Sequence, residues 1–328
     1  MTLNPVHLDP TGQVALYQTG DRYHDYLAGR FGQRFLDYRR RWRETSERGD
    51  PGDFPLSLDL AINSGCQLNC VMCPLPGRPG GREVRLMDKA LFGRLMAQAA
   101  EHGLAAVTFG LGGEPLLHPR AADWVSRAER AGIMDIRLGT NGLLLTADVA
   151  RALVDSRLTR LEVSVDAVRP ETYRAVRGGG LERLERAIDQ FLAVRLKAGS
   201  EIPLLRLSFL KLDLNQGELE PFLSRWQDRA DLISIQEPIW FPGSRLPRPE
   251  VSGRALAPVC AQSWQRLAVN HDGQVWPCCS WYGDQLLPFN AAEMDVAAIW
   301  LSREMRELRR RLSATPEEIP PACLQCEY

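Results

Sequence analysis

Between residues 56 and 236 the chain repeats one pattern, in which a short apolar run is followed by a longer amphipathic stretch. The apolar runs predict strands, and the amphipathic stretches predict helices. Alternation of this kind is typical of a parallel sheet with helices on its outside. The fold class is therefore predicted to be α/β. The six expected strands are 56–62, 105–110, 136–139, 161–165, 204–210 and 232–236.

Capping residues mark where several of the intervening helices begin and end. Asp88 is an acidic N-cap candidate, and Gly103 and Gly132 follow amphipathic stretches where a left-handed residue would end a helix. Pro170 is placed to open another helix. The expected helices are 88–102, 118–131, 146–155, the stretch after 170, 181–197 and 218–227.

Composition shifts divide the chain into three predicted parts. Residues 1–54 read as a helical extension, whose Phe31, Phe35, Tyr38 and Trp42 recur at helical spacing and should dock it on the main domain. Residues 238–249 are too rich in proline and glycine for an element interior and predict a linker. The expected domains are therefore 1–54, 55–240 and 241–328.

Charge balance narrows the range of partners. The 328 residues contain 40 Lys and Arg against 41 Asp and Glu, a net charge of −1. Such a chain has no general attraction to nucleic acid or to an acidic membrane. The first residues lack the pattern of an export signal, and no apolar run reaches membrane-spanning length. We therefore expect a cytoplasmic protein that binds a small-molecule substrate, with neither nucleic acid nor membrane as a partner.

Eight cysteines stand at spacings that suit metal ligation better than disulfides. Cys66, Cys70 and Cys73 form a C-x3-C-x2-C group directly after the first predicted strand. Three thiolates are one short of a closed zinc site or a fully ligated iron–sulfur cluster, so an open coordination position is expected. A zinc site with a distant fourth ligand, or a chance grouping in a surface loop, would also fit these residues.

The spacing and place of this group resemble the radical S-adenosylmethionine (SAM) superfamily, with Met72 where the signature usually has an aromatic residue. The resemblance implies a partial (β/α)6 barrel with its chemistry at the carboxyl ends of the strands. It also implies a SAM-binding 4Fe–4S cluster on Cys66, Cys70 and Cys73. Reductive cleavage of SAM would give a 5′-deoxyadenosyl radical that abstracts hydrogen from substrate. An electron donor such as flavodoxin or ferredoxin would be required.

Gly112, Gly113, Glu114 and Pro115 follow the second predicted strand and match the Gly-Gly-Glu-Pro element that contacts the methionyl amino group of SAM in the family. Glycines let a backbone approach closely, and carbonyl and carboxylate oxygens accept from an ammonium. A glycine turn that opens a helix is the alternative.

Polar residues also follow the later strands. By position along the family fold, Asn141, Ser164 and Asp166 would contact the carboxylate and ribose of SAM. Turns that cap the strand ends explain the same residue types equally well. Further polar candidates for SAM or substrate contacts are Arg206, Ser208, Gln236 and Glu237.

The remaining five cysteines all follow residue 250. Cys260, Cys278, Cys323 and Cys326 resemble the ligands of the twitch domain, a shortened SPASM domain built from a β-hairpin and a helix, which binds one auxiliary 4Fe–4S cluster. Asp272-Gly273 would form the hairpin turn, with a cysteine on the second strand. A four-cysteine zinc site is the rival interpretation. Cys279 could be a hydrogen donor, a buried bystander, or the ligand in place of Cys278.

The function implied by the resemblance is hydrogen abstraction by a radical SAM enzyme. A fully ligated second cluster would accept an electron, which favours oxidation of a secondary alcohol of a sugar- or aminocyclitol-like substrate in a biosynthetic pathway. The cysteine spacing resembles that of aminocyclitol-oxidising twitch enzymes, the 2-deoxy-scyllo-inosamine dehydrogenases. Epimerisation with Cys279 as hydrogen donor, peptide modification, and a non-enzymatic zinc-binding role are the alternatives.

Overall fold

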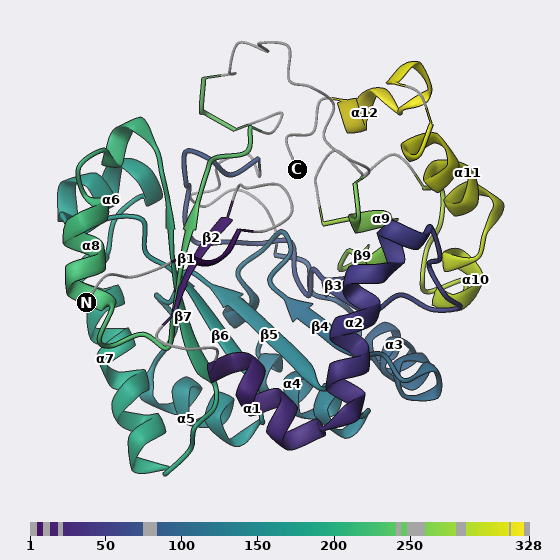
Figure 1. Cartoon of the computed structure of the whole chain (residues 1–328). Coiled ribbons are helices and arrows are strands. Elements are labelled where there is room, and N and C mark those ends of the chain that lie inside the picture. The colour runs from purple at the N-terminus through teal and green to yellow at the C-terminus, as the bar shows by residue number, and fades with distance from the viewer. Residues whose placement is uncertain are drawn as a thin grey trace.

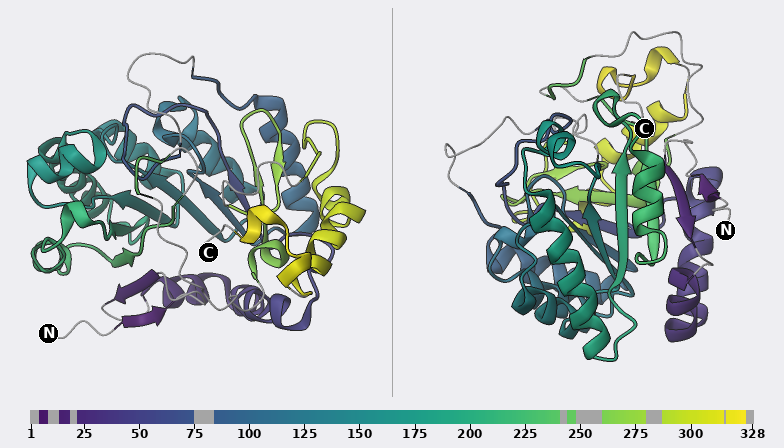
Figure 2. Two further views of the ribbon diagram at one scale, coloured as in Figure 1. Left: turned by 90° about the horizontal axis from the view of Figure 1, so that it is seen from above. Right: turned by 90° about the vertical axis from the view of Figure 1, so that its left-hand side faces the viewer.

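The computed structural model describes residues 5–8, 14–18, 22–74, 84–240, 244–247, 260–279, 287–314 and 316–324. Its centre is a ten-stranded sheet in the order β1-β2-β8-β7-β6-β5-β4-β3-β9-β10 (Figure 1). Strands β3 to β8 pair in parallel and follow one another along the chain. They are β3 (Ser57–Leu60), β4 (Ala106–Phe109), β5 (Asp135–Thr140), β6 (Arg160–Ser164), β7 (Leu204–Leu210) and β8 (Leu232–Gln236). The predicted α/β fold is confirmed, and its sheet curves without closing into a full barrel (Figure 2).

Helices cover the outer face of this sheet. They are α3 (Lys89–His102), α4 (Ala121–Arg130), α5 (Ala147–Asp155), α6 (Pro170–Arg177), α7 (Leu181–Lys197) and α8 (Leu219–Trp226), with 3-10 turns η1 (Pro115–Leu117) and η2 (Asp213–Asn215). The Asp88 side chain accepts from Ala90 N, and left-handed Gly103 ends α3, as predicted. Helix α4 starts three residues later than the predicted 118, because residues 118–120 form a turn between η1 and α4.

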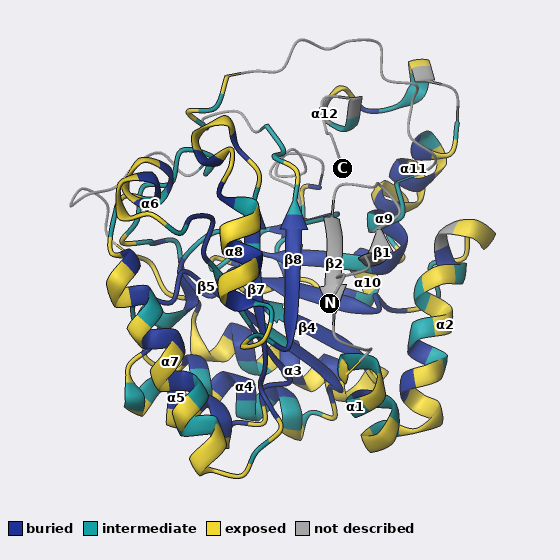
Figure 3. Cartoon of the chain, turned by 60° about the vertical axis from the view of Figure 1, so that its left-hand side comes forward, coloured by how far each residue is buried: buried dark blue, intermediate teal, exposed yellow. Residues whose placement is uncertain are grey.

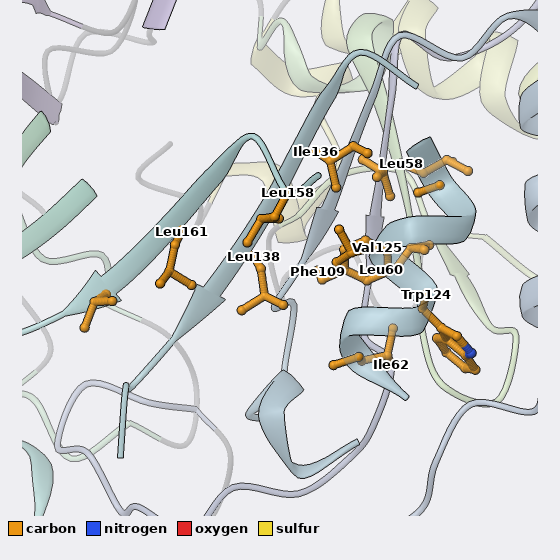
Figure 4. Close-up of a cluster of buried hydrophobic side chains, with 14 of the residues drawn as sticks. Leu58, Leu60, Ile62, Phe109, Trp124, Val125, Ile136, Leu138, Leu158 and Leu161 are labelled. Carbon is orange, nitrogen blue, oxygen red and sulfur yellow. The ribbon is translucent and has the colours of Figure 1, made fainter. Parts of the chain in front are cut away.

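The hydrophobic core lies between the sheet and these helices. Alternate strand residues point toward the helices, and Leu58, Leu138 and Leu161 are completely buried there (Figure 4). Trp124 of α4 stacks on Phe92 of α3, with ring centroids 4.1 Å apart. Burial is concentrated on the strands and on the inward faces of the helices, while the outward faces are exposed (Figure 3).

The N-terminal residues add both strands and helices to this core. Strands β1 (Pro5–Leu8) and β2 (Val14–Gln18) form an antiparallel pair, and β2 also pairs with β8. The prediction of a purely helical extension over 1–54 is therefore wrong at its start. Helices α1 (Arg22–Phe31) and α2 (Gln33–Arg48) lie across the sheet from α3–α8 (Figure 2, left). Phe35 and Tyr38 are buried against Leu56, which confirms the predicted docking.

The C-terminal residues continue the same sheet. Strand β9 (Arg266–Val269) pairs in parallel with β3 and antiparallel with β10 (Val275–Trp276). The Asp272-Gly273 turn forms as predicted, with Asn270 N donating to Gln274 O at 2.9 Å. The remaining elements are α9 (Gln262–Gln265), α10 (Val296–Trp300), α11 (Arg303–Leu312), η4 (Pro316–Glu318) and α12 (Pro321–Leu324). None of the described helices combines the length and apolar character needed to cross a membrane.

Candidate functional site

The Cys66–Cys73 loop leaves the carboxyl end of β3 and lies against the loop that follows β4. Asn63 Nδ2 donates to Glu114 O at 2.7 Å, and Glu114 N donates to Gly65 O at 2.7 Å. A Cβ atom on Gly113 would lie 2.3 Å from Asn63 Oδ1, so only glycine allows this approach. The Gly-Gly-Glu-Pro segment is thus built directly onto the cysteine loop.

The Glu114 side chain turns away from solvent and toward the next strand. Its carboxylate accepts from Leu116 N at 3.0 Å, Thr140 Oγ1 at 2.7 Å and Asn141 N at 2.8 Å. Burial raises the pKa of Glu114, and these three hydrogen bonds oppose the rise. Glu114 therefore ties the ends of β4 and β5 together. Its predicted contact with an ammonium stays a prediction.

Asn141 lies beside the first of the three cysteines. Its Nδ2 is 3.7 Å from Cys66 Sγ, and its Oδ1 accepts from Gln67 Nε2 at 3.0 Å. Leu68 N also donates to Cys66 Sγ, at 3.5 Å. Burial raises the pKa of the Cys66 thiol to about 11; the Leu68 N–H lowers it, while Glu114 and the other two cysteines raise it.

Asp166 holds an arginine against the second cysteine. Asp166 is completely buried and has a positive φ of 63°. Its carboxylate accepts from Arg177 Nε at 2.7 Å and from Leu210 N at 2.8 Å. Arg177 Nη1 in turn lies 3.7 Å from Cys70 Sγ. A fully buried carboxylate of this kind positions its neighbours, so the expectation that Asp166 meets ribose hydroxyls gains no support. Ser164, the third of that group, is half-buried at the end of β6.

Charged side chains occupy the inner face of the sheet. Glu162 Oε1 accepts from Arg206 Nη1 at 2.8 Å, with Arg160 Nε at 3.4 Å and Arg137 Nε at 3.7 Å. Burial would raise the pKa of Glu162, but Arg137, Arg206 and Arg160 outweigh it and hold the pKa well below its usual range. In the neighbouring pair, Arg266 Nη1 donates to Asp59 Oδ2 at 3.0 Å.

The other polar candidates differ in placement. Arg206 is buried. Its guanidinium donates to Glu162 Oε1 at 2.8 Å and to Ser234 Oγ at 2.6 Å. Ser208 O accepts from Val165 N at 3.1 Å and thus joins β7 to the end of β6. Gln236 O accepts from Lys211 N at 2.8 Å, and the Glu237 carboxylate forms an ion pair with the Lys211 ammonium at the surface.

The C-terminal cysteines flank the hairpin of β9 and β10: Cys260 precedes it, and the others follow it. Cys260, Cys278, Cys279 and Cys323 are half-buried, while Cys326 lies outside the described residues. Cys278 comes two residues after β10, not on the strand itself as predicted. Cys279 Sγ lies 3.9 Å from Gln262 Oε1. Among the described residues, no group of three His, Cys, Asp or Glu side chains is arranged to hold a single metal ion.

Sequence reasoning missed Arg177 and Arg245. Arg245, in the predicted linker, donates from its backbone N to Val71 O at 2.7 Å and from its side chain to Asn69 O. Both arginines contact the cysteine loop from segments distant in sequence. An arginine that precedes three glycines at a helix end is too common a pattern to have marked Arg177 as a site residue.

Comparison with known families decides the identity of this site. The model of the radical SAM superfamily matches residues 60–207, and that of the SPASM iron–sulfur cluster-binding domain matches residues 260–327. Residues 60–207 are a radical SAM domain. The chain thus carries a radical SAM domain followed by a SPASM-type iron–sulfur domain, a combination that implies SAM and two 4Fe–4S clusters as cofactors.

The curated relatives match about half of this chain. A probable GTP 3′,8-cyclase of Methanococcus maripaludis is 29% identical over 182 residues, 55% of this chain and 58% of the relative. The GTP 3′,8-cyclase of Limosilactobacillus fermentum is 35% identical over 141 residues, 42% of each chain. The match thus spans less than two thirds of the length of these relatives.

Solved structures match a larger share of this chain than the curated relatives do. BtrN in complex with AdoMet and 2-DOIA has a TM-score of 0.52 at 17% identity, covering 78% of this chain and 86% of BtrN. Streptococcus suis SuiB bound to S-adenosylmethionine has a TM-score of 0.58 at 18% identity, covering 89% of this chain and 75% of SuiB. At these identities the likeness establishes the fold alone.

The residues present suit an iron–sulfur cluster. The 66–73 loop offers three half-buried thiols, and N–H groups of Leu68, Asn141 and Arg177 point at two of the sulfurs. Donors of this kind stabilise thiolates and are typical of cluster surroundings.

Proposed function

We propose that this enzyme oxidises a secondary alcohol of a sugar- or aminocyclitol-like molecule to a ketone. The observation that carries the proposal is the second cysteine group: Cys260, Cys278 and Cys323, with Cys326 beyond the described residues. Four thiolates would leave no iron open to substrate, so a cluster held by them would serve as an electron acceptor. Loss of one hydrogen atom from carbon, one proton from oxygen and one electron converts the alcohol into the ketone.

The N-terminal site would supply the hydrogen abstraction. We propose Cys66, Cys70 and Cys73 as ligands of the first cluster, which with SAM provides the abstracting 5′-deoxyadenosyl group. The Glu114 carboxylate, through Thr140 and the Asn141 backbone, would hold the neighbouring loops in place. The proposed SAM-contacting residues are Gly112, Gly113, Glu114, Pro115, Asn141 and Ser164; Asp166 instead holds Arg177.

The inner face of the barrel supports a polar substrate. Arg137 and Glu162 keep 28% and 22% of their side-chain surface exposed there, while most of the arginine network around them is buried. A wall of guanidinium and carboxylate groups suits hydroxyl, amino or phosphate substituents better than apolar ones. An electron donor such as flavodoxin or ferredoxin would reduce the first cluster.

A cyclase acting on a nucleoside triphosphate is the second candidate. The curated relatives favour it, since one is a probable GTP 3′,8-cyclase and the other a GTP 3′,8-cyclase. The same arginines would suit a triphosphate. Against it stands the four-cysteine C-terminal group, because a cluster held by four thiolates would leave no iron open to a nucleotide.

Two further outcomes rest on single observations. Epimerisation would use Cys279, whose half-buried thiol lies near the predicted second cluster ligands. Peptide modification is suggested by SuiB, a structure of which is bound to the precursor peptide SuiA.

One experiment separates these reactions. Reconstituted enzyme, SAM and reductant would be incubated in deuterated water with a panel of aminocyclitols, amino sugars and GTP. Oxidation predicts a product lighter by two hydrogens that a carbonyl reagent traps. Epimerisation predicts solvent deuterium on carbon that Cys279→Ala abolishes, and cyclisation predicts a product from GTP alone. Turnover of GTP with no reaction of any alcohol would refute the proposal.

A further inference from the structure

We propose that Arg177, held by Asp166, raises the reduction potential of the first iron–sulfur cluster through its contact with the Cys70 sulfur. The inference rests on Cys70 being a ligand of that cluster. It assigns a role to a residue pair that the hydrogen-abstraction chemistry itself does not use.

The geometry fixes the guanidinium in one orientation. Arg177 Nε donates to Asp166 Oδ2 at 2.7 Å, and Nη2 forms an ion pair with the same oxygen. The other terminal nitrogen, Nη1, points at Cys70 Sγ at 3.7 Å. One side of the planar fork is thus bound by the carboxylate, which leaves the opposite side for sulfur.

Burial makes this contact electrostatically significant. The side chain of Arg177 is 13% exposed and that of Asp166 is 1% exposed. Asp166 is itself held, because its Oδ1 accepts from Leu210 N at 2.8 Å and its backbone O accepts from Asn215 Nδ2 at 2.8 Å. A cation kept in place away from water acts at higher strength than a solvated one.

The backbone fixes the cysteine loop at the same point. Val71 N donates to Val176 O at 2.9 Å, and the Cys70 thiol lies 3.9 Å from Arg177 O. Helix α6 ends at Gly178 in the left-handed conformation, which lets the chain turn beside Asn69. The distance between guanidinium and sulfur is therefore set by the end of α6.

The sign of the effect follows from charge. A reduced cluster carries one more negative charge than the oxidised cluster, so a neighbouring cation favours reduction. Hydrogen bonds to cluster sulfurs act in the same direction. Loss of Arg177 should therefore make the cluster harder to reduce.

The test is a redox titration of the reconstituted full-length enzyme, followed by electron paramagnetic resonance. The signal of the first cluster is the one that changes when SAM is added and that is missing from a Cys66→Ala, Cys70→Ala, Cys73→Ala variant. At the wild-type midpoint, Arg177→Gln should hold about one tenth as much reduced as oxidised first cluster, a shift of about 59 mV for one electron. The second cluster should not move.

Two further variants keep the result interpretable. Asp166→Asn with Arg177→Gln removes the cation without leaving a buried carboxylate alone, and should shift the midpoint in the same direction by less. Arg174→Gln removes an exposed charge from the same helix and should leave it unchanged. An unchanged or raised midpoint in the two Arg177 variants at wild-type iron content would overturn the inference. Loss of first-cluster iron from both would overturn it too, since Arg177 would then only hold the loop. Absence of first-cluster iron from the wild type would instead refute Cys70 as a ligand.

Discussion

Neighbouring residues of β6 serve opposite faces of the sheet. Leu161 and Val163 point outward into the helix-covered core and are completely buried. Arg160 and Glu162 point inward, where ion pairs replace hydrocarbon contacts. One strand thus contributes both to the stability of the fold and to the charged surroundings of the site. The two roles fall on alternate residues, because successive side chains of a strand point to opposite faces of the sheet.

The largest expected effect belongs to the outer face. Leu161→Ala removes buried methyl groups between sheet and helices and should lower the free energy of unfolding by about 3 kcal/mol. Urea unfolding measures this loss. SAM affinity of the folded fraction should stay at its wild-type value, and a large drop in that affinity would break the division between the two faces.

Glu162→Gln tests the inner face at the adjacent position. It leaves Arg206, Arg160 and Arg137 without their shared carboxylate and should lower the free energy of unfolding by about 3 kcal/mol. This is the lower end of the range for a broken buried ion pair, because Glu162 is partly exposed. The variant should also differ in its pH response.

The sign of that response is fixed by the lowered pKa. The folded-state pKa of Glu162 lies below the unfolded value of about 4.3. Its contribution to the free energy of unfolding is therefore complete above about pH 5 and is lost as the pH falls. Unfolding midpoints between pH 6 and pH 3 should fall more steeply for the wild type than for Glu162→Gln. Parallel curves would contradict the role given to the arginine cluster.

Gly113→Ala tests the carboxyl ends of the strands, where the cysteine loop lies. The new Cβ would meet Asn63 and Gly65 atoms at 2.3 to 2.7 Å and displace the cysteine loop. SAM binding to the reconstituted enzyme should weaken by about tenfold, or 1.4 kcal/mol. Gly93→Ala is the matched control: α3 has open space there, so this variant should gain up to about 1 kcal/mol of stability and bind SAM normally.

The smallest effect is expected for Thr140→Val. It removes the hydrogen bond that Thr140 Oγ1 donates to Glu114 and the one that it accepts from Gly142 N, and should cost about 1 kcal/mol in the free energy of unfolding. Calorimetric unfolding measures it. A cost as large as that of Leu161→Ala would mean that the loop network, and not the core, dominates stability.

Sequence patterns predicted the central fold because each signal was local. The strand at 204–210 and the helix at 181–197 were predicted with the observed ends, since an apolar run and an amphipathic stretch depend on neighbours in the chain. The parallel pairing of β9 with β3 was missed, because it joins segments about 200 residues apart. The pairing of β2 with β8 was missed for the same reason, since it joins residues 14–18 to residues 232–236.

The candidate site was predictable only in part. The cysteines and the glycine turn lie in short motifs that can be recognised from the sequence alone. The direction of a side chain cannot be recognised in this way: Asp166 and Glu114 bind protein donors that come from β7, β5 and α6. Their orientation depends on how the strand ends meet, which the sequence of each segment does not contain.

The most direct test of the account is the release of 5′-deoxyadenosine by anaerobically reconstituted enzyme with SAM and a strong reductant. The account predicts release by the wild type, with about eight irons per chain for two four-iron clusters. The Cys66→Ala, Cys70→Ala, Cys73→Ala variant should keep about four irons and release none, whereas Cys279→Ala should still release it. A fully loaded wild type that releases no 5′-deoxyadenosine, or a triple variant that matches the wild type, would contradict the central claim.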